Sequence, residues 1–252
     1  MKKAFYAIAI LAVAAAAFTG CKKDDDKKKD EKIVKRVAMC GDKWDKYYFT
    51  YDEDGRIKEV NRNPNSDGGY ERTWTFNWTS TGAVVNYVKE GEEKPDITIN
   101  IGENGYISSY TDEYGDTRYL TYDSDGYLTQ VKKGDEVKSN IIVEDGNYVK
   151  WSRFSSGAEQ FKIQTFLKDD NIGGIHPDYA DKTDPARWFY EIGLCGKASK
   201  KLLDQAVWDG SESIAVHTYE KDDDGYVTTV SKVYGTGEPE LYYYEWEVVK
   251  KK

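Results

Sequence analysis

A short phrase that recurs along the chain constrains its fold more than any other feature of the sequence. Each copy has an apolar or aromatic stretch, then an acidic or amide residue followed by glycine, then a second alternating stretch. The phrase occurs at 50–57, 100–107, 121–128 and 221–227, with weaker copies at 80–82 and 144–146. Asp-Gly and Asn-Gly favour tight hairpin turns, because glycine adopts a positive φ without steric cost. The phrase therefore predicts a series of β-hairpins.

The spacing and the flanks of the phrase indicate how the hairpins are arranged. Between residues 55 and 146 its glycines lie 20 to 27 residues apart, about the length of two strands and two turns. Trp74, Phe76 and Trp78 alternate with Thr and Asn, so that one face of the strand is apolar and the other polar. Consecutive hairpins of this kind predict a mainly β domain, an antiparallel meander that closes as a barrel or folds as a sandwich.

A barrel that spans a membrane is a weaker interpretation. Such barrels carry an outward-facing apolar band about 25 Å tall. The strands expected here are short and rich in charge, and the chain closes on Val249 followed by three lysines. We therefore expect the apolar face of the strands to point towards a core.

The hairpin pattern stops between about Gly157 and Val216. Within this insertion, Asp184 is a candidate N-cap, Pro185 suits a first helical turn, and Gly193 suits a helix stop. These signals predict a short helix, and residues 200–208 predict either a further helical turn or an irregular crossover. We expect a short helical insertion near 184–208, where a regular meander has room for a specific site.

The N-terminus has the pattern of a bacterial lipoprotein. Two lysines precede the apolar stretch 4–18, which has the length of a signal peptide and is short for a bilayer span. Phe-Thr-Gly-Cys at 18–21 resembles the lipobox, in which the cysteine receives diacylglycerol before cleavage. We expect a signal peptide at 1–20 and a lipid on Cys21. The alternative is an ordinary secretory peptide that contains a cysteine.

A charged tether is expected between the lipid and the folded domain. Residues 22–32 include no apolar side chain and cannot contribute to a core. The tether therefore covers 21–32 and the β-rich domain 33–252. Lysine followed by an acidic run resembles the signal that sends Bacteroidetes lipoproteins to the outer face of the outer membrane. We expect a lipid-anchored protein of the outer membrane at the cell surface; the alternative is a spacer without an address.

The charge of the mature chain argues against nucleic acid as a partner. The sequence has 36 basic and 45 acidic residues, and loss of 1–20 removes two lysines, which leaves 34 against 45 and a net charge of −11. A surface of this sign repels phosphate backbones. The domain is long enough to bury a sizeable core, as one β domain or as two halves divided near Gly157.

Cysteine and histidine usage predicts no metal or cofactor. Cys40 and Cys195 remain once Cys21 is lipidated, and they are expected either as one disulfide or as two buried thiols. Their spacing to His176 and His217 matches no metal site. The acidic hairpin turns lack the ligand order of a calcium loop.

The insertion and its surroundings carry a resemblance to a known family. Tyr-Glu-Ile-Gly-Leu-Cys-Gly-Lys-Ala-Ser-Lys stands at 190–200, His-Thr-Tyr at 217–219 and Asp-Gly-Tyr-Val at 224–227. Together with the lipobox and the hairpin phrase, these segments resemble a family of Bacteroidetes lipoproteins of unknown function with a porin-like β fold. The resemblance implies that fold over most of the mature chain, and it brings no activity and no catalytic residues.

The aromatic content points to binding or to packing. The chain has seven Trp and 21 Tyr. Such residues stack on sugar rings and anchor protein interfaces, but they also favour strands and fill β cores. If they form a ligand platform, the candidates are Trp188, Phe189 and Tyr190 on the insertion, with Trp151 and Trp208.

Three functional hypotheses follow. A surface binding module for a glycan or peptide predicts exposed aromatic side chains in one concave patch. A structural or accessory envelope protein that docks on an outer-membrane partner predicts a filled interior without a cleft. A hydrolase needs two carboxylates that face each other across a cleft, and the sequence singles out no such pair. We expect the protein not to be an enzyme.

Overall fold

The computed structural model of the chain describes residues 33–64, 69–155, 157–176 and 187–249. The chain divides into two units, Met1–Ile33 and Val34–Lys252. The expected signal peptide, Cys21 and the tether lie outside the described residues. No helix among the residues described is long and apolar enough to cross a membrane.

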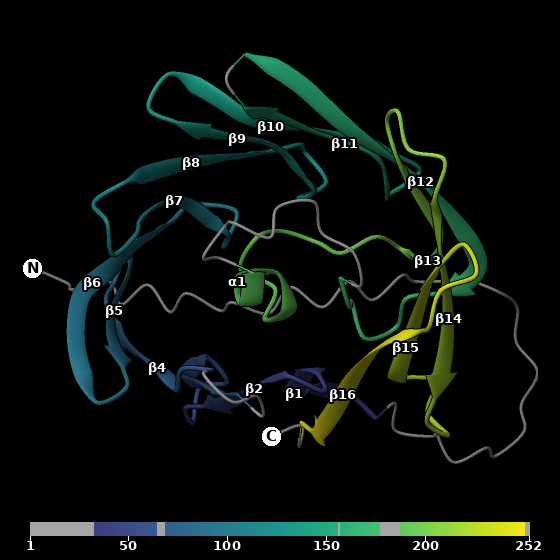
Figure 1. Cartoon of the computed structure of the whole chain (residues 1–252). Helices are drawn as coiled ribbons and strands as arrows, with labels where there is room; N and C mark the ends of the chain where they lie inside the picture. Colours follow the sequence, from purple (N-terminus) through teal and green to yellow (C-terminus); the bar gives the residue numbers. More distant parts are fainter. Residues whose placement is uncertain (1–32, 65–68, 156, 177–186, 250–252) are drawn as a thin grey trace, which may run out of the picture. The chain divides into compact units, whose positions relative to one another are not determined.

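The described part of the second unit is a closed antiparallel barrel of sixteen strands (Figure 1). Each strand pairs with its neighbours in the sequence, and β16 closes the barrel by pairing with β1. The meander that the hairpin phrase predicts is confirmed, as a barrel. The strands are β1 (Lys35–Asp42), β2 (Asp45–Tyr51), β3 (Ile57–Pro64), β4 (Arg72–Trp78), β5 (Gly82–Lys89), β6 (Glu92–Ile101), β7 (Ile107–Thr111), β8 (Thr117–Tyr122), β9 (Leu128–Lys133), β10 (Glu136–Glu144), β11 (Asn147–Ser155), β12 (Ala158–Asp170), β13 (Lys201–Trp208), β14 (Ile214–Lys221), β15 (Val227–Tyr234) and β16 (Glu240–Val248).

The hairpin phrase forms one kind of turn at 52–55, 123–126 and 222–225. Its first Asp accepts backbone N–H bonds from the residues two and four positions later, as at Asp52, Asp123 and Asp222. The glycine three residues after that Asp has a φ of 81 to 88°. The strand register shifts directly beside each of these turns. This is a turn followed by a left-handed glycine and a bulge, which suits a three-residue hairpin loop.

On β4 and β6 the apolar face of the strand points into the barrel. On β4, Trp74 and Phe76 are buried, and Thr75 between them lies on the outer face. On β6, Ile97 and Ile99 are buried, and Thr98 between them is exposed. The core is therefore the lumen of the barrel. Burial of one aliphatic side chain of this kind stabilises the fold by roughly 1.5–3 kcal/mol.

The insertion differs in part from its prediction. Its helix, α1, covers Arg187–Glu191. Asp184 and Pro185 lie outside the described residues. The helix ends in a Schellman motif, because the N–H of Gly193 donates to the Tyr190 carbonyl (2.9 Å) and that of Leu194 to the Phe189 carbonyl (2.9 Å). The helix stop at Gly193 is confirmed.

Residues 200–208, expected as a helical turn or crossover, were assigned wrongly. They contain strand β13, which pairs with β12 on one side and β14 on the other. The bonds to two neighbouring strands outweigh the local preference of this segment. The helical part of the insertion is limited to α1.

The topology places the start of the first strand beside the end of the last strand. Lys35 at the start of β1 lies opposite Val248 at the end of β16. We call this the proximal end of the barrel, and the opposite end the distal end. Because neighbouring strands are antiparallel, the β2–β3, β8–β9 and β14–β15 turns and the β12–β13 connection that carries α1 all lie at the proximal end.

Candidate functional site

The helix α1 lies inside the ring of strands (Figure 1). Its three aromatic side chains contact different parts of the wall. Trp188 packs against β4, with its ring centroid 5.4 Å from that of Trp74 and 5.5 Å from that of Phe76. Phe189 meets the ring of Tyr110 on β7 edge-on at 5.7 Å. The helix therefore acts as a plug in the lumen.

The third aromatic residue of the plug contacts the opposite wall. The Tyr190 ring lies 6.0 Å from Trp151 on β11 and 5.5 Å from the imidazole of His176. Tyr148 completes the group at 6.0 Å from Trp151. Burial lowers the pKa of His176 to about 4, because the apolar surroundings disfavour the charged imidazolium. His176 is therefore neutral at pH 7.

The prediction of an exposed aromatic platform is wrong. Trp188, Phe189, Tyr190 and Trp151 are only 2, 1, 6 and 3 % exposed. Trp208 is half-buried and packs against the same core, with the Arg153 guanidinium 4.8 Å from its ring centroid. The structure brings the five residues into one core. The reason is geometric: an eight-stranded barrel is filled by its own side chains, whereas a sixteen-stranded one leaves a lumen that another element must fill.

The segment that follows α1 closes the proximal side of the lumen. We call residues 192–200 the latch. Its backbone is hydrogen-bonded to three neighbouring hairpins: the N–H of Ile107 donates to the Leu194 carbonyl, that of Lys197 to the Gly126 carbonyl, and that of Lys200 to the Gly146 carbonyl, each at 2.9 Å. The plug is thus fixed to the wall by the main chain as well as by its rings.

A close approach between two glycines positions the latch. A Cβ added to Gly196 would lie 2.8 Å from the Gly126 carbonyl oxygen and 2.9 Å from the Tyr122 ring. The φ of Gly196 is 92°, in the left-handed region. Both facts require glycine at this position of the latch.

A small pocket lies beside the plug, at the seam between β12 and β13. Here the register of the two strands shifts twice, and the pocket is lined by Tyr148, Trp151, Gln164, His176 and Leu202 among others. The space open to a water-sized molecule is about 30 Å³. That volume holds a few water molecules, whereas sites for drug-sized ligands have several hundred Å³. A sugar ring does not fit this pocket.

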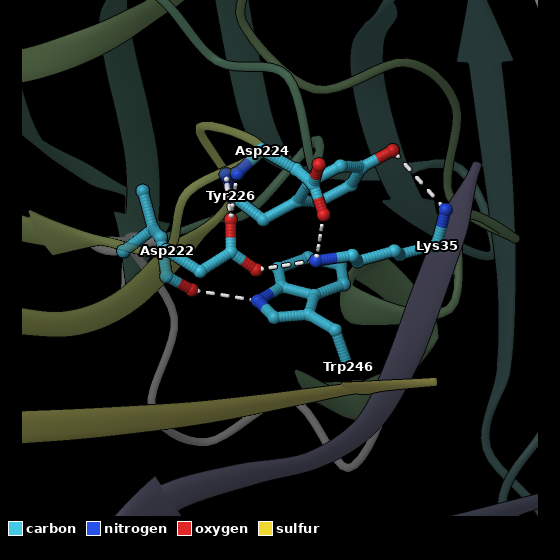
Figure 2. A network of polar contacts seen from close by, with 6 residues as sticks. Lys35, Asp222, Asp224, Tyr226 and Trp246 are labelled. Carbon is cyan, nitrogen blue, oxygen red and sulfur yellow. Dashed lines mark hydrogen bonds and ion pairs between the residues drawn. The ribbon is translucent and has the colours of Figure 1, made fainter. Parts of the chain in front are cut away.

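A polar network joins the first strand to the β14–β15 turn (Figure 2). The Lys35 ammonium lies 2.7 Å from the Asp222 carboxylate and 2.6 Å from that of Asp224. Its backbone N–H donates to the hydroxyl of Tyr226 (3.1 Å), whose ring lies 5.1 Å from that of Trp246 on β16. We call this network the clamp. It spans β16, at the place where the barrel closes.

The clamp also lowers the pKa of Asp222. Burial opposes ionisation of Asp222, but hydrogen bonds from Lys35 and from the backbone N–H of Tyr226 outweigh it and lower the pKa of that carboxyl. The carboxylate is therefore the stable form in the folded chain.

The two cysteines of the described residues are both buried, and neither forms a disulfide. Of the two outcomes that the sequence leaves open for Cys40 and Cys195, the structure has two buried thiols and not the disulfide. Both thiols belong to the main core. Among the described residues, no group of three or more His, Cys, Asp or Glu side chains is placed to hold a metal ion.

Two parts of the outer wall differ in chemistry. On β3–β6, which we call the polar wall, outward side chains form hydrogen bonds across strands. Asn77 donates to Asn86 (2.5 Å), Asn86 to Asp96 (2.9 Å), and Thr73 to Asn61 (2.8 Å). Such pairs are solvated and hold the strands in register.

The other part of the wall lies on β10–β15 and carries aliphatic side chains. We call it the aliphatic face; its members alternate with buried residues and point outwards, and they are Ile142, Ile163, Val207, Ile214, Val216 and Val233. The sequence reasoning missed this face, together with the latch and the clamp. The only local signal for the face is that, in parts of these strands, both the inward and the outward positions carry apolar residues.

The chain matches no described protein family and no curated protein. Its structure is similar to that of a porin-like protein from Bacteroides uniformis ATCC 8492, with a TM-score of 0.64 and 18 % sequence identity, over 84 % of this chain and 98 % of that chain. A porin-like protein from Bacteroides vulgatus ATCC 8482 is similar with a TM-score of 0.45 and 11 % identity, over 83 % and 98 %. The first similarity shows a shared barrel fold. The porin-like β fold implied by the sequence is therefore confirmed.

Proposed function

We propose that the protein is an envelope lipoprotein, held on the outer membrane by lipid on Cys21, whose filled barrel docks on an outer-membrane protein. The observation that carries this proposal is the filled lumen. The plug and the latch occupy the space through which a solute would pass. Contact with a partner is therefore left to the outer surface of the barrel.

The polarity of the wall supports attachment by lipid rather than by the barrel itself. A membrane-spanning barrel is apolar outside and polar inside. On β4 and β5 this barrel has the reverse arrangement, with Trp74 and Phe76 inside and hydrogen-bonded Asn77 and Asn86 outside. On β12–β15 the inside also holds polar side chains, among them Lys162 and His217. The similarity to a porin-like protein concerns the fold, and it supports an envelope β protein.

A glycan- or peptide-binding module has less support. The aromatic side chains expected to form its platform are buried in the core, and the pocket beside them holds only a few water molecules. We also propose that the protein has no catalytic role. A peptide that binds on the outer wall would be a form of the docking proposal.

The lipid anchor is tested by Cys21→Ser in the native host. We expect the unchanged protein to fractionate with the outer membrane. It should also be cleaved by protease added to whole cells. The variant should lose its membrane attachment. If both proteins fractionate with the membrane after a salt wash, the lipid is not the anchor.

Docking is tested in the intact envelope by placing a photo-crosslinking residue at outward positions of the polar wall and of the aliphatic face. We expect a discrete adduct with one outer-membrane protein from some positions and none from the others. As the competing test, the purified barrel is titrated with glycans while its tryptophan fluorescence is followed. A saturable change with a glycan, and no protein adduct from any position, would instead favour the binding module.

A further inference from the structure

The aliphatic face is continuous across neighbouring strands. In the strand register, Ile163 lies opposite Val207, and Val207 lies opposite Ile214. In the next row, Val216 lies opposite Val233. Directly opposed residues have Cβ atoms about 4.5–5.5 Å apart, so these side chains touch. The face is therefore one patch rather than scattered exposed residues.

The size of the patch suits the centre of a protein interface. At a strand spacing of about 4.8 Å, the row from Ile142 to Ile214 extends over five strands, or roughly 20 Å. The second row is aliphatic only on β14 and β15, because Gln205 and Thr165 continue it. The patch therefore covers roughly 200 Å². Ile142 and Ile214 at its two edges are 48 and 43 % exposed. A standard interface buries about 800 Å² on each partner, with an apolar centre and a polar rim. The patch supplies such a centre.

We propose that the aliphatic face pairs with the same face of a second copy of this chain. The main row has Ile163 in the middle, Lys150 and Val207 on the adjacent strands, and Ile142 and Ile214 at the ends. A two-fold axis through Ile163 sets isoleucine against isoleucine at both ends of the row. Closed dimers need such a self-complementary patch.

The single charged residue in the row does not oppose this pairing. The Lys150 ammonium lies 4.1 Å from the centre of the Phe161 ring and 3.3 Å from the Glu159 carboxylate of its own wall. Its charge is therefore balanced within the copy, and its methylene stem adds to the apolar surface. In the dimer that stem packs on Val207 of the second copy.

The net charge of the chain decides how pairing responds to salt. Each mature copy carries a net charge of −11, from 34 basic and 45 acidic residues once the two lysines of 1–20 are removed. Two copies repel each other, and added salt screens that repulsion. Pairing should therefore strengthen as salt is added. A basic partner held by charge would bind less tightly under the same change.

The test is sedimentation velocity of the mature chain from residue 22 onwards, without lipid, from low micromolar to submillimolar concentration. The barrel is a compact unit whose strand pairing is complete without the lipid. We expect a reversible dimer whose dissociation constant falls as salt is added. Ile163→Glu should weaken the dimer at least about 10-fold, because it buries an unpaired charge at the axis. Thr98→Glu, the same charge on the polar wall, should leave it unchanged.

A crosslink provides a second measurement that does not depend on affinity. Ile163→Cys places two thiols at the axis, and mild oxidation should yield a covalent dimer with native circular dichroism. Thr98→Cys should stay monomeric. A chain that is monomeric at every concentration, or a dimer that Ile163→Glu leaves intact, overturns the proposal. Neither result bears on docking to an envelope partner, which is absent from the purified sample.

Discussion

The lumen and the outer wall are two faces of the same strands, and they stabilise the barrel by different means. Inside, Trp188 packs on Trp74 and Phe76 away from water; outside, Asn77 and Asn86 share hydrogen bonds for which water competes. Burial of aromatic rings contributes several kcal/mol, whereas exposed polar pairs contribute less than about 1 kcal/mol. The stability of the fold therefore lies in the packing of plug against wall, and the outer wall is free to differ in chemistry for recognition.

The largest test of this contrast removes a ring from the plug. Trp188→Ala should lower the free energy of unfolding by about 3–5 kcal/mol, because it leaves a large cavity in the core. Trp44, which is 53 % exposed, is the matched control, and Trp44→Ala should change stability by no more than about 0.5 kcal/mol. Urea unfolding followed by circular dichroism measures both. Equal losses in the two variants would remove the contrast between lumen and wall.

The second test uses pH to charge the lumen. Burial lowers the pKa of His176 to about 4 from its ordinary value of 6.5. Between these values the unfolded chain binds a proton that the folded chain does not, so stability is full above pH 6.5 and falls as the pH drops towards 4. The loss from this residue should approach about 3 kcal/mol. Comparison of the unchanged chain with His176→Gln isolates it: the variant should lose less stability over this range, and parallel curves would contradict the assignment.

The third test concerns the latch that holds the plug. Gly196→Ala should lower stability by about 1–3 kcal/mol, because the new methyl group meets the Gly126 carbonyl and the φ is left-handed. Gly210 has a similar positive φ, but a Cβ there would meet nothing within 4 Å. Gly210→Ala should therefore cost only the backbone strain, about 1 kcal/mol. Thermal unfolding of the two variants compares them, and a Gly196→Ala chain no weaker than Gly210→Ala would show that the latch is not tightly fitted.

The smallest effect is expected at the clamp. Lys35→Met removes both ion pairs and keeps most of the apolar stem, and solvent screens the charges, so the loss should be smaller than in the three tests above. The loss should shrink further as salt is added. Lys94→Met, which removes the exposed pair with Glu92, is the control. A loss that is insensitive to salt would mean that Lys35 acts through packing.

The hairpins could be predicted from the sequence because their determinants are local. An Asp and a glycine three residues apart specify the turn around Gly126 without reference to the rest of the chain. Alternation likewise placed Trp74 and Phe76 on one face. Whether that face points into a barrel or a sandwich depends on the number of strands that pair, which no short segment encodes.

The site was harder to predict for the same reason. In β13 the apolar residues Leu202, Leu203, Ala206 and Val207 have a spacing that also suits a helix, and only pairing with β12 and β14 makes the segment a strand. The aromatic residues of α1 have the composition of a ligand platform. They are buried because a lumen of sixteen strands needs filling, and the width of that lumen is a property of the whole barrel.

The clamp also has a consequence for the order of folding. Lys35 is 187 residues away from Asp222 along the chain, and β1 finds its second neighbour only in β16. Contacts of such long sequence separation slow folding, because a long loop must close before they form. If Cys21 receives its lipid early in export, the chain reaches the membrane surface before its first strand has both partners. Closure of the barrel would then be the last event in the maturation of an already anchored protein.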